Sequence, residues 1–116
     1  MTPEQFRRLV LSFSGSEEHA HHGHPDFRVN GRIIATLGFP DETRAMVKLT
    51  PEQQADFVHD YPAVFSPASG AWGRQGSTSV CLPKARKTEM SSAVEAAWRN
   101  ALAAPPTRSK RKPAKP

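Results

Sequence analysis

The stretch FRVNGRIIATL at residues 27–37 decides the fold, because it joins two alternating segments through a tight turn. Asn30-Gly31 is a preferred dipeptide for two-residue β-hairpin turns, since both positions tolerate a positive φ. Polar and apolar residues alternate on both sides of this turn, as they do in strands with one buried face. The predicted apolar face carries Phe27, Val29, Ile33, Ala35 and Leu37.

The alternation continues along the chain. Residues 38–43, which include Pro40-Asp41, predict the next turn. Residues 44–49 then alternate again, which predicts a third strand and an antiparallel meander with one apolar face. Residues 61–70 predict a loop because of their prolines and glycine. Residues 71–74 and 77–82, on either side of Gln75-Gly76, predict a second hairpin.

Two helices are predicted by the same tetrapeptide, TPEQ, at residues 2–5 and 50–53. Each copy offers a capping threonine, a proline at the first helical position and a glutamine three residues after the cap. A third helix is expected from about Thr88 to about Ala103. The order of elements predicts a single α+β domain over residues 1–103, with helices packed on one face of an antiparallel sheet.

Composition and length exclude several classes of protein. The chain has 116 residues, of which 37% are hydrophobic, and no apolar run approaches the ~20 residues of a membrane span. The N-terminus reads as an amphipathic helix and not as a signal segment. The single cysteine, Cys81, excludes an internal disulfide and a cysteine-based zinc cage. We therefore expect a cytoplasmic, monomeric protein without membrane partners.

The positive charge is concentrated at the C-terminus. The net charge is +5, but five of the 16 basic residues follow Thr107, which leaves the preceding body with 11 basic and 11 acidic residues. The segment Ala104–Pro116 lacks large apolar side chains, so we expect it to be disordered. Such a tail can bind phosphates by counterion release, or it can serve solubility alone. Its basic run includes Lys110, Arg111 and Lys112.

A histidine cluster is the first candidate for chemistry. Residues 19–24 contain four histidines. In an extended segment His22, His24 and Asp26 would share one side, as in a two-histidine, one-carboxylate metal set. A glycine and a proline interrupt regular strand geometry here, and this favours a polar edge strand over a metal site. We expect no metal and no cofactor.

No pattern in the chain indicates catalysis. Cys81 lies between two apolar residues, and nothing nearby in the sequence would activate its thiol. The chain has no nucleophile elbow, phosphate-cradling loop or dinucleotide fingerprint. The glycines of residues 70–76 are typical of turns and of close backbone approaches. We expect a non-enzymatic protein.

The predicted sheet offers a basic surface. By strand alternation, the side opposite the apolar face carries Arg28, Arg32, Arg44 and Lys48, and Arg74 would extend this group from the second hairpin. Cations grouped in this way suit phosphate contacts, which position a protein on nucleic acid without reading its sequence. The alternative is a solvated outer face whose charges serve only solubility.

The two tryptophans have different surroundings. Trp98 lies on the apolar side of the third predicted helix and belongs to the core. Trp72 lies among glycines, where it would either close the end of the sheet or stack on a base or ligand.

Four segments together resemble the MmcQ/YjbR-like family over about residues 4–103. They are HPDFRV at 24–29, VKL at 47–49, GAWGR at 70–74 and AWR at 97–99. The chain departs from the family pattern at Ser77, where the family usually has tryptophan. The resemblance implies a CyaY-like, frataxin-like fold and a proposed double-wing DNA-binding surface built from β-hairpins, with no catalytic residues to carry over. It also raises iron binding, but frataxin-type binding uses an acidic ridge, for which this chain has too few acidic residues.

Two functions follow from these patterns. The first is DNA binding by the basic face and the basic tail. The second is a small anionic ligand site, or a protein-interaction site, formed by His24, Asp26, Trp72 and Arg74.

Overall fold

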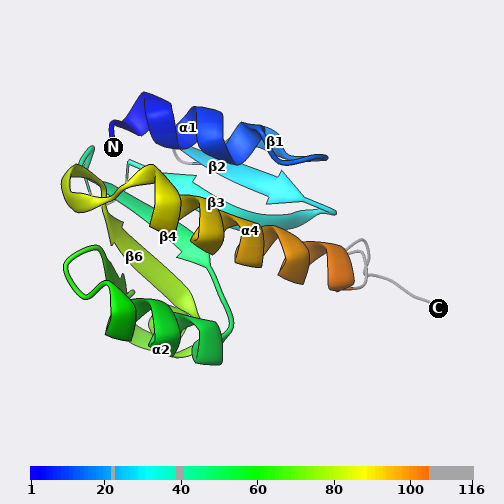
Figure 1. Ribbon diagram of the computed structural model, residues 1–116. Helices are drawn as coiled ribbons and strands as arrows, with labels where there is room; N and C mark the ends of the chain where they lie inside the picture. The colour runs from blue at the N-terminus through cyan, green and yellow to red at the C-terminus, as the bar shows by residue number, and fades with distance from the viewer. Residues whose placement is uncertain (22, 39–40, 105–116) are drawn as a thin grey trace.

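The computed structural model describes residues 1–21, 23–38 and 41–104. Its centre is a six-stranded antiparallel sheet with strand order β1-β2-β3-β4-β6-β5. The long helices α1, α2 and α4 lie on one side of this sheet (Figure 1). The elements are α1 (Pro3–Leu11), β1 (Glu17–His21), β2 (His24–Val29), β3 (Arg32–Leu37), β4 (Arg44–Lys48), α2 (Pro51–Asp60), β5 (Phe65–Pro67), α3 (Gly70–Arg74), β6 (Ser77–Cys81), a 3₁₀ turn (Leu82–Lys84) and α4 (Lys87–Ala103).

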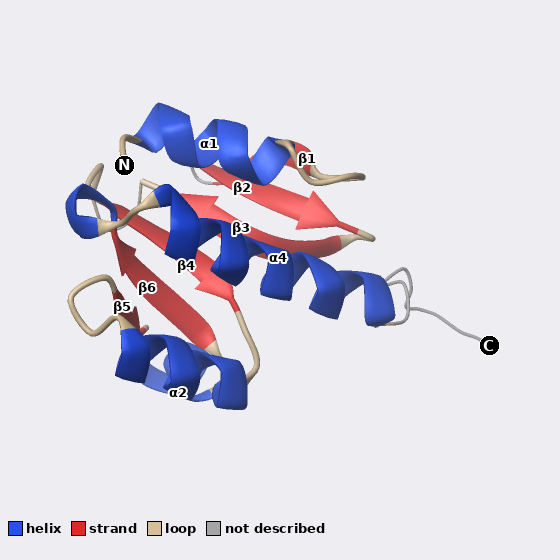
Figure 2. Ribbon diagram, viewed as in Figure 1, coloured by secondary structure: helices blue, strands red, loops and turns tan. Residues whose placement is uncertain are grey.

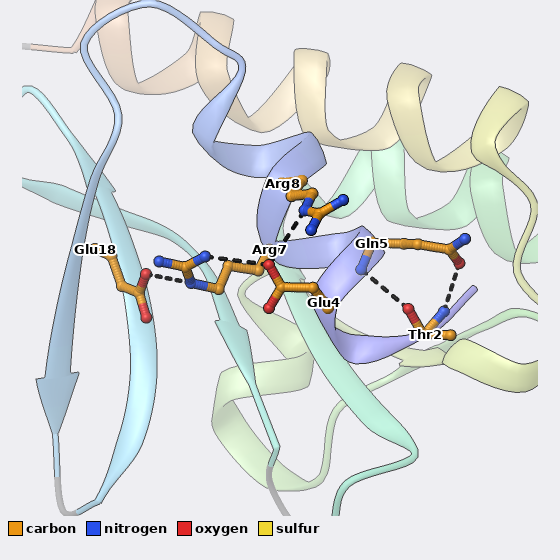
Figure 3. Close-up of polar contacts among 6 residues, drawn as sticks. All are labelled: Thr2, Glu4, Gln5, Arg7, Arg8 and Glu18. Carbon is orange, nitrogen blue, oxygen red and sulfur yellow. Dashed lines mark hydrogen bonds and ion pairs between the residues drawn. The ribbon is translucent and has the colours of Figure 1, made fainter.

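Both capping tetrapeptides start helices, as predicted. The Thr2 hydroxyl accepts a hydrogen bond from the Gln5 backbone N–H at 3.1 Å, and the Gln5 side chain accepts one from the Thr2 N–H at 2.8 Å (Figure 3). Thr50 and Gln53 form the same reciprocal pair at the start of α2. These contacts are local in sequence, so the motif alone is sufficient to form them.

The hairpin of β2 and β3 forms around Asn30 and Gly31, whose φ angles of 56° and 76° are the positive values expected. The predicted alternation along β3 is wrong at one step. The pairing shifts register between Phe27 and Arg28, so one extra residue of β3 is accommodated there. Ile33 is therefore 40% exposed, whereas Ile34 is buried in the core.

The predicted hairpin of residues 71–82 does not form. Residues 70–74 are the short helix α3, and β6 instead pairs with β4 on one side and β5 on the other. The strand β5 lies in the stretch expected to be a loop. Both errors have one cause: β6 takes its partners from strands distant in sequence, which the local pattern around Gln75-Gly76 cannot reveal.

The core lies between the sheet and the helices. In Figure 2, α4 crosses the sheet, and its contacts are with β2, β3 and β4. Trp98, predicted to belong to the core, is only partly buried and packs against the core from its edge. Its ring centre lies 5.6 Å from that of Phe13, and its indole N–H donates to the Ser14 carbonyl. The fully buried side chains include Phe6, Phe27, Phe65, Ile34, Leu82 and Met90.

In the described part of the chain, no helix combines the length and apolar character that a bilayer crossing requires. The basic tail, with Lys110, Arg111 and Lys112, lies outside the described residues except for Ala104.

Candidate nucleic-acid interface

The side of the sheet away from α1, α2 and α4 is called here the open face. Residues that pair directly across antiparallel strands point to the same side. The registers place one residue of each strand in a row across this face, in the order His19, Asp26, Thr36, Met46, Ser79 and Ser66. The floor of the open face is therefore mostly small and polar, with Met46 at its centre.

Arg28 lies on the open face, but its charge is already partnered. Its Nε donates to Asp26 Oδ1 at 2.9 Å, and its Nη2 donates to Asp26 Oδ2 at 3.3 Å. Asp26 is only 2% exposed, and its hydrogen bond raises the pKa of the Arg28 guanidinium. A two-point contact of this kind fixes the guanidinium plane. Arg28 and Asp26 are thus a neutral pair and not a free phosphate contact.

Arg32 does not belong to the open face, contrary to the strand-alternation prediction. It pairs with Val29, whose side chain is buried in the core, so the two share the side of the sheet that carries α4. The same register shift that exposes Ile33 explains this result. At this end of the hairpin, the Asn30 side-chain amide donates to the Ala101 and Ala104 carbonyls of the α4 terminus.

Arg44 and Lys48 are the cations that the open face does present. They lie on β4 on either side of Met46, and their partners on β6 are Cys81 and Ser77. Among residues 1–21, 23–38 and 41–104, no carboxylate forms a salt bridge with either of them.

The cations of α1, unlike Arg44 and Lys48, form salt bridges with acidic neighbours that the structure describes. Arg7 Nε donates to Glu18 Oε1 at 2.6 Å, which raises the pKa of the Arg7 guanidinium, and Arg7 Nη1 lies 3.3 Å from Glu4 (Figure 3). Arg8 also reaches Glu4 at 3.3 Å. Acidic neighbours therefore offset the basic charge of this helix by direct contact, whereas Arg44 and Lys48 form no salt bridge with a described carboxylate, although the charge of Arg44 contributes to the lowered pKa of the nearby Asp41 carboxyl.

Trp72 stands beside Lys48. The Lys48 ammonium lies 5.6 Å from the centre of the indole ring, a cation–π distance. Trp72 is 69% exposed, so it does not close the end of the sheet. Arg74 is also exposed, but residues two apart on a helix point in different directions. Arg74 therefore does not extend the group formed by Arg44, Lys48 and Trp72.

Gln54 holds α3, and with it Trp72, in place. Its buried amide nitrogen donates to the Gly73 carbonyl at 3.0 Å, the Ser77 carbonyl at 2.9 Å and the Thr78 hydroxyl at 3.2 Å. Gly73 itself packs so closely that an added Cβ would lie 1.8 Å from the Ala68 carbonyl oxygen. The sequence prediction missed Gln54.

A signal for Gln54 was nevertheless present in the sequence. Gln54 precedes Phe57, Val58 and Tyr61 by three, four and seven residues, so it occupies a core position of the helix that begins at Pro51. A polar residue at such a position has to find hydrogen-bond partners.

Two hollows lie beside Trp72, with volumes of about 690 and 950 Å³. The smaller lies on the open face, and the larger extends from there to Arg32 and to Asn100 of α4. Both are lined by Trp72, Thr36, Met46 and Ser77. Ser77 is 2% exposed, and its hydroxyl has no hydrogen-bond partner among the described residues. Arg44 lines the smaller hollow and Lys48 the larger one.

The second predicted site is not assembled in these hollows. Neither hollow is lined by His24, Asp26 or Arg74. His24 lies instead near Gly38, its Nδ1 being 3.8 Å from where a Cβ of that glycine would stand. In these two hollows, Trp72 is therefore not joined by the other three residues of that site.

Three of the clustered histidines lie on paired strands: His19 and His21 on β1 and His24 on β2, with His21 paired to His24. His22, part of the predicted metal set, lies outside the described residues. Within the described ranges, no three His, Cys, Asp or Glu residues are placed to hold a metal ion together.

Comparison with known proteins agrees with this fold. A family model described as YjbR matches residues 11–100. The crystal structure of Deinococcus radiodurans protein DR2400, with domain DUF419, is similar with a TM-score of 0.70 and 17% sequence identity. That similarity covers 88% of this chain and 79% of DR2400, and at this identity it establishes the fold alone. The comparison with curated proteins finds no match.

Proposed function

We propose that this chain, which belongs to the YjbR family, is a non-enzymatic DNA-binding protein that contacts phosphates through the open face of its sheet. The main observation is that Lys48 lies against the exposed Trp72, and Arg44 lines a hollow with it, on a face that none of the long helices covers. Their charges are not offset by salt bridges to any described carboxylate. A cation that forms no salt bridge on an open surface attracts the phosphate backbone and releases its counterions.

The contact surface proposed here is smaller than the sequence pattern suggested. Arg28 is neutralised by Asp26, and Arg32 lies on the other side of the sheet. Arg74 lies two residues from Trp72 on α3, a spacing at which helical side chains do not face each other. Two phosphate contacts from the open face, with further contacts from the tail after Thr107, position the protein on DNA without reading sequence. We therefore propose binding that is weak, dependent on salt and largely independent of sequence.

The experiment measures the affinity of the full chain for labelled single-stranded and duplex DNA over a range of salt concentrations. Binding to either form supports the proposal. The double variant R44Q/K48Q is the test. It should lower affinity and reduce the slope of log K against log salt by up to about 1.8, at ~0.9 per phosphate contact for duplex DNA. Truncation after Thr107 should reduce the slope by up to about 4.5 if all five tail cations contact phosphates.

The matched control is K84Q/K87Q, which removes the same charge from two exposed residues in the 3₁₀ turn and at the start of α4. This control should change affinity much less than R44Q/K48Q. The proposal fails if the full chain binds neither form of DNA at low salt. It also fails if the two double variants behave alike, or if truncation of the tail alone abolishes binding.

A further inference from the structure

We infer that the hollow between Trp72 and Ser77 receives an unpaired nucleobase, so that the open face prefers single-stranded DNA to duplex DNA. This inference rests on the proposed function and specifies its substrate. Three observations support it: the exposure of Trp72, the unpartnered hydroxyl of Ser77 and the placement of Arg44 at one and Lys48 at the other of the two hollows that Trp72 lines.

Trp72 is exposed although the backbone of the helix that carries it is anchored to the rest of the fold. The helix that carries it is fixed by Gln54, which donates to Gly73, and by the close packing of Gly73 on Ala68. The indole is nevertheless 69% exposed. A large aromatic ring that projects to the surface from an anchored helix suits stacking on a planar partner, and every nucleobase provides such a plane.

Ser77 supplies a polar group at the inner wall of the hollow. Its hydroxyl is buried, and it is the one buried side-chain polar atom that lacks a partner in the described part of the chain. An unsatisfied buried hydroxyl is costly, and a hydroxyl can both donate and accept. The edge of a base stacked on Trp72 carries donors and acceptors that would satisfy it.

The cations complete a site for a nucleotide strand. Lys48 lies against Trp72, and Arg44 lies four residues away on the same strand, roughly 13 Å along β4. Met46 and the hydroxyls of Thr36 and Ser79 form the floor between them. A strand laid along β4 would place phosphates near both cations while one base reaches Trp72.

A duplex cannot use this hollow in the same way. Its bases are paired and stacked on one another, so a base reaches Trp72 only after it is flipped out, at a cost of a few kcal/mol by general estimates. Single-stranded DNA presents unstacked bases without that cost. The geometry therefore favours the single strand, whereas phosphate contacts alone would not discriminate in this way.

The test compares a labelled oligonucleotide as a single strand and as a duplex at low salt, by fluorescence anisotropy with the full chain. The wild type should bind the single strand at least about tenfold more tightly. W72A should lower single-strand affinity by roughly 5- to 150-fold, the range for loss of one stacked base. It should change duplex affinity less than about twofold, and W72F should retain most of the single-strand affinity.

Two further variants sharpen the result. S77A should lower single-strand affinity by roughly 2- to 13-fold, the equivalent of one hydrogen bond. L102A removes an exposed apolar side chain of α4 and is the control that should change neither affinity. Circular dichroism melts confirm that each variant is folded before its affinity is compared.

The outcomes separate this inference from the function on which it rests. Equal affinity of the wild type for the two forms, or equal losses in W72A for both, overturns the base-binding hollow but leaves phosphate contact by Arg44 and Lys48 intact. Failure to bind either form at low salt overturns both.

Discussion

The buried carboxylate of Asp26 holds the guanidinium of Arg28 through two hydrogen bonds, of 2.9 and 3.3 Å, on the face of the sheet that carries Arg44 and Lys48. The aspartate thereby removes one cation from a surface that would otherwise present three. This pairing limits the affinity of the open face for phosphates, and its loss should have the opposite effect from most surface substitutions.

Asp26→Asn should strengthen DNA binding, because it frees Arg28 to contact a phosphate. The salt slope should steepen by up to about 0.9. The free energy of unfolding should fall by about 1–3 kcal/mol, since a buried charged hydrogen bond is weakened. Glu17→Gln is the matched control, because it removes an exposed acid from a residue paired with Arg28 on β1 without breaking the Asp26 contact. If both variants strengthen binding equally, net charge alone is responsible.

Gln54→Leu should destabilise the fold and loosen α3. Leucine is similar in size to glutamine and suits a core position. It cannot donate the hydrogen bonds that the Gln54 amide makes to the Gly73 and Ser77 carbonyls and to the Thr78 hydroxyl. Urea denaturation should show a loss of about 1–3 kcal/mol. Gln75→Leu, at an exposed position, should change the free energy of unfolding little. An unchanged midpoint for Gln54→Leu would contradict the role assigned to Gln54.

Gly76→Ala should be much more destabilising than Gly15→Ala. Both glycines have a positive φ, 110° and 81°, so both substitutions carry backbone strain of about 1–2 kcal/mol. Only at Gly76 would the new Cβ meet another atom, the Leu49 carbonyl oxygen, at 1.8 Å, whereas Gly15 faces open space. The clash should add roughly 1–3 kcal/mol. Thermal melts that place the two variants at the same midpoint would show that β6 can shift freely.

Much of the fold could be predicted where the determinant is local. Thr2 and Thr50 cap their helices with groups three residues away, and Asn30-Gly31 folds its own turn. The errors arose where strand pairing departs from what the local pattern shows. Ile34 replaces Ile33 in the core because β2 and β3 pair with a shift inside their hairpin, and β6 pairs with β4 and β5 and not with residues 71–74.

The candidate site was predictable in part for the same reason. Arg44 and Lys48 share a face by strand alternation alone, and the structure places both there. That Arg28 is neutralised depends on which side chain lies next to it in the folded sheet. The position of Trp72 depends on α3, which the pattern assigned to a hairpin, and on Gln54, whose partners come from two other elements.

The stability of the turn before β4 should depend on pH. Asp41 accepts hydrogen bonds from the hydroxyl and the backbone N–H of Thr43, which lower the pKa of its carboxyl below the ordinary value of 3.8. Its stabilising contribution is therefore present above pH 3.8 and is lost as the pH falls through the lower, folded-state pKa. Melting temperatures of the wild type and Asp41→Asn should converge in that acidic range. A difference that stays constant down to the lowest pH would contradict this linkage.

The most direct measurement of the central claim is an NMR titration of the isotope-labelled full chain with a short DNA oligonucleotide at low salt. We predict that the shifts concentrate on Arg44, Met46 and Lys48 and on the indole N–H of Trp72, while the outer surfaces of α1 and α4 stay unchanged. Shifts confined to α1 and α4, or to the residues after Thr107, would contradict the assignment of the open face as the DNA-binding surface.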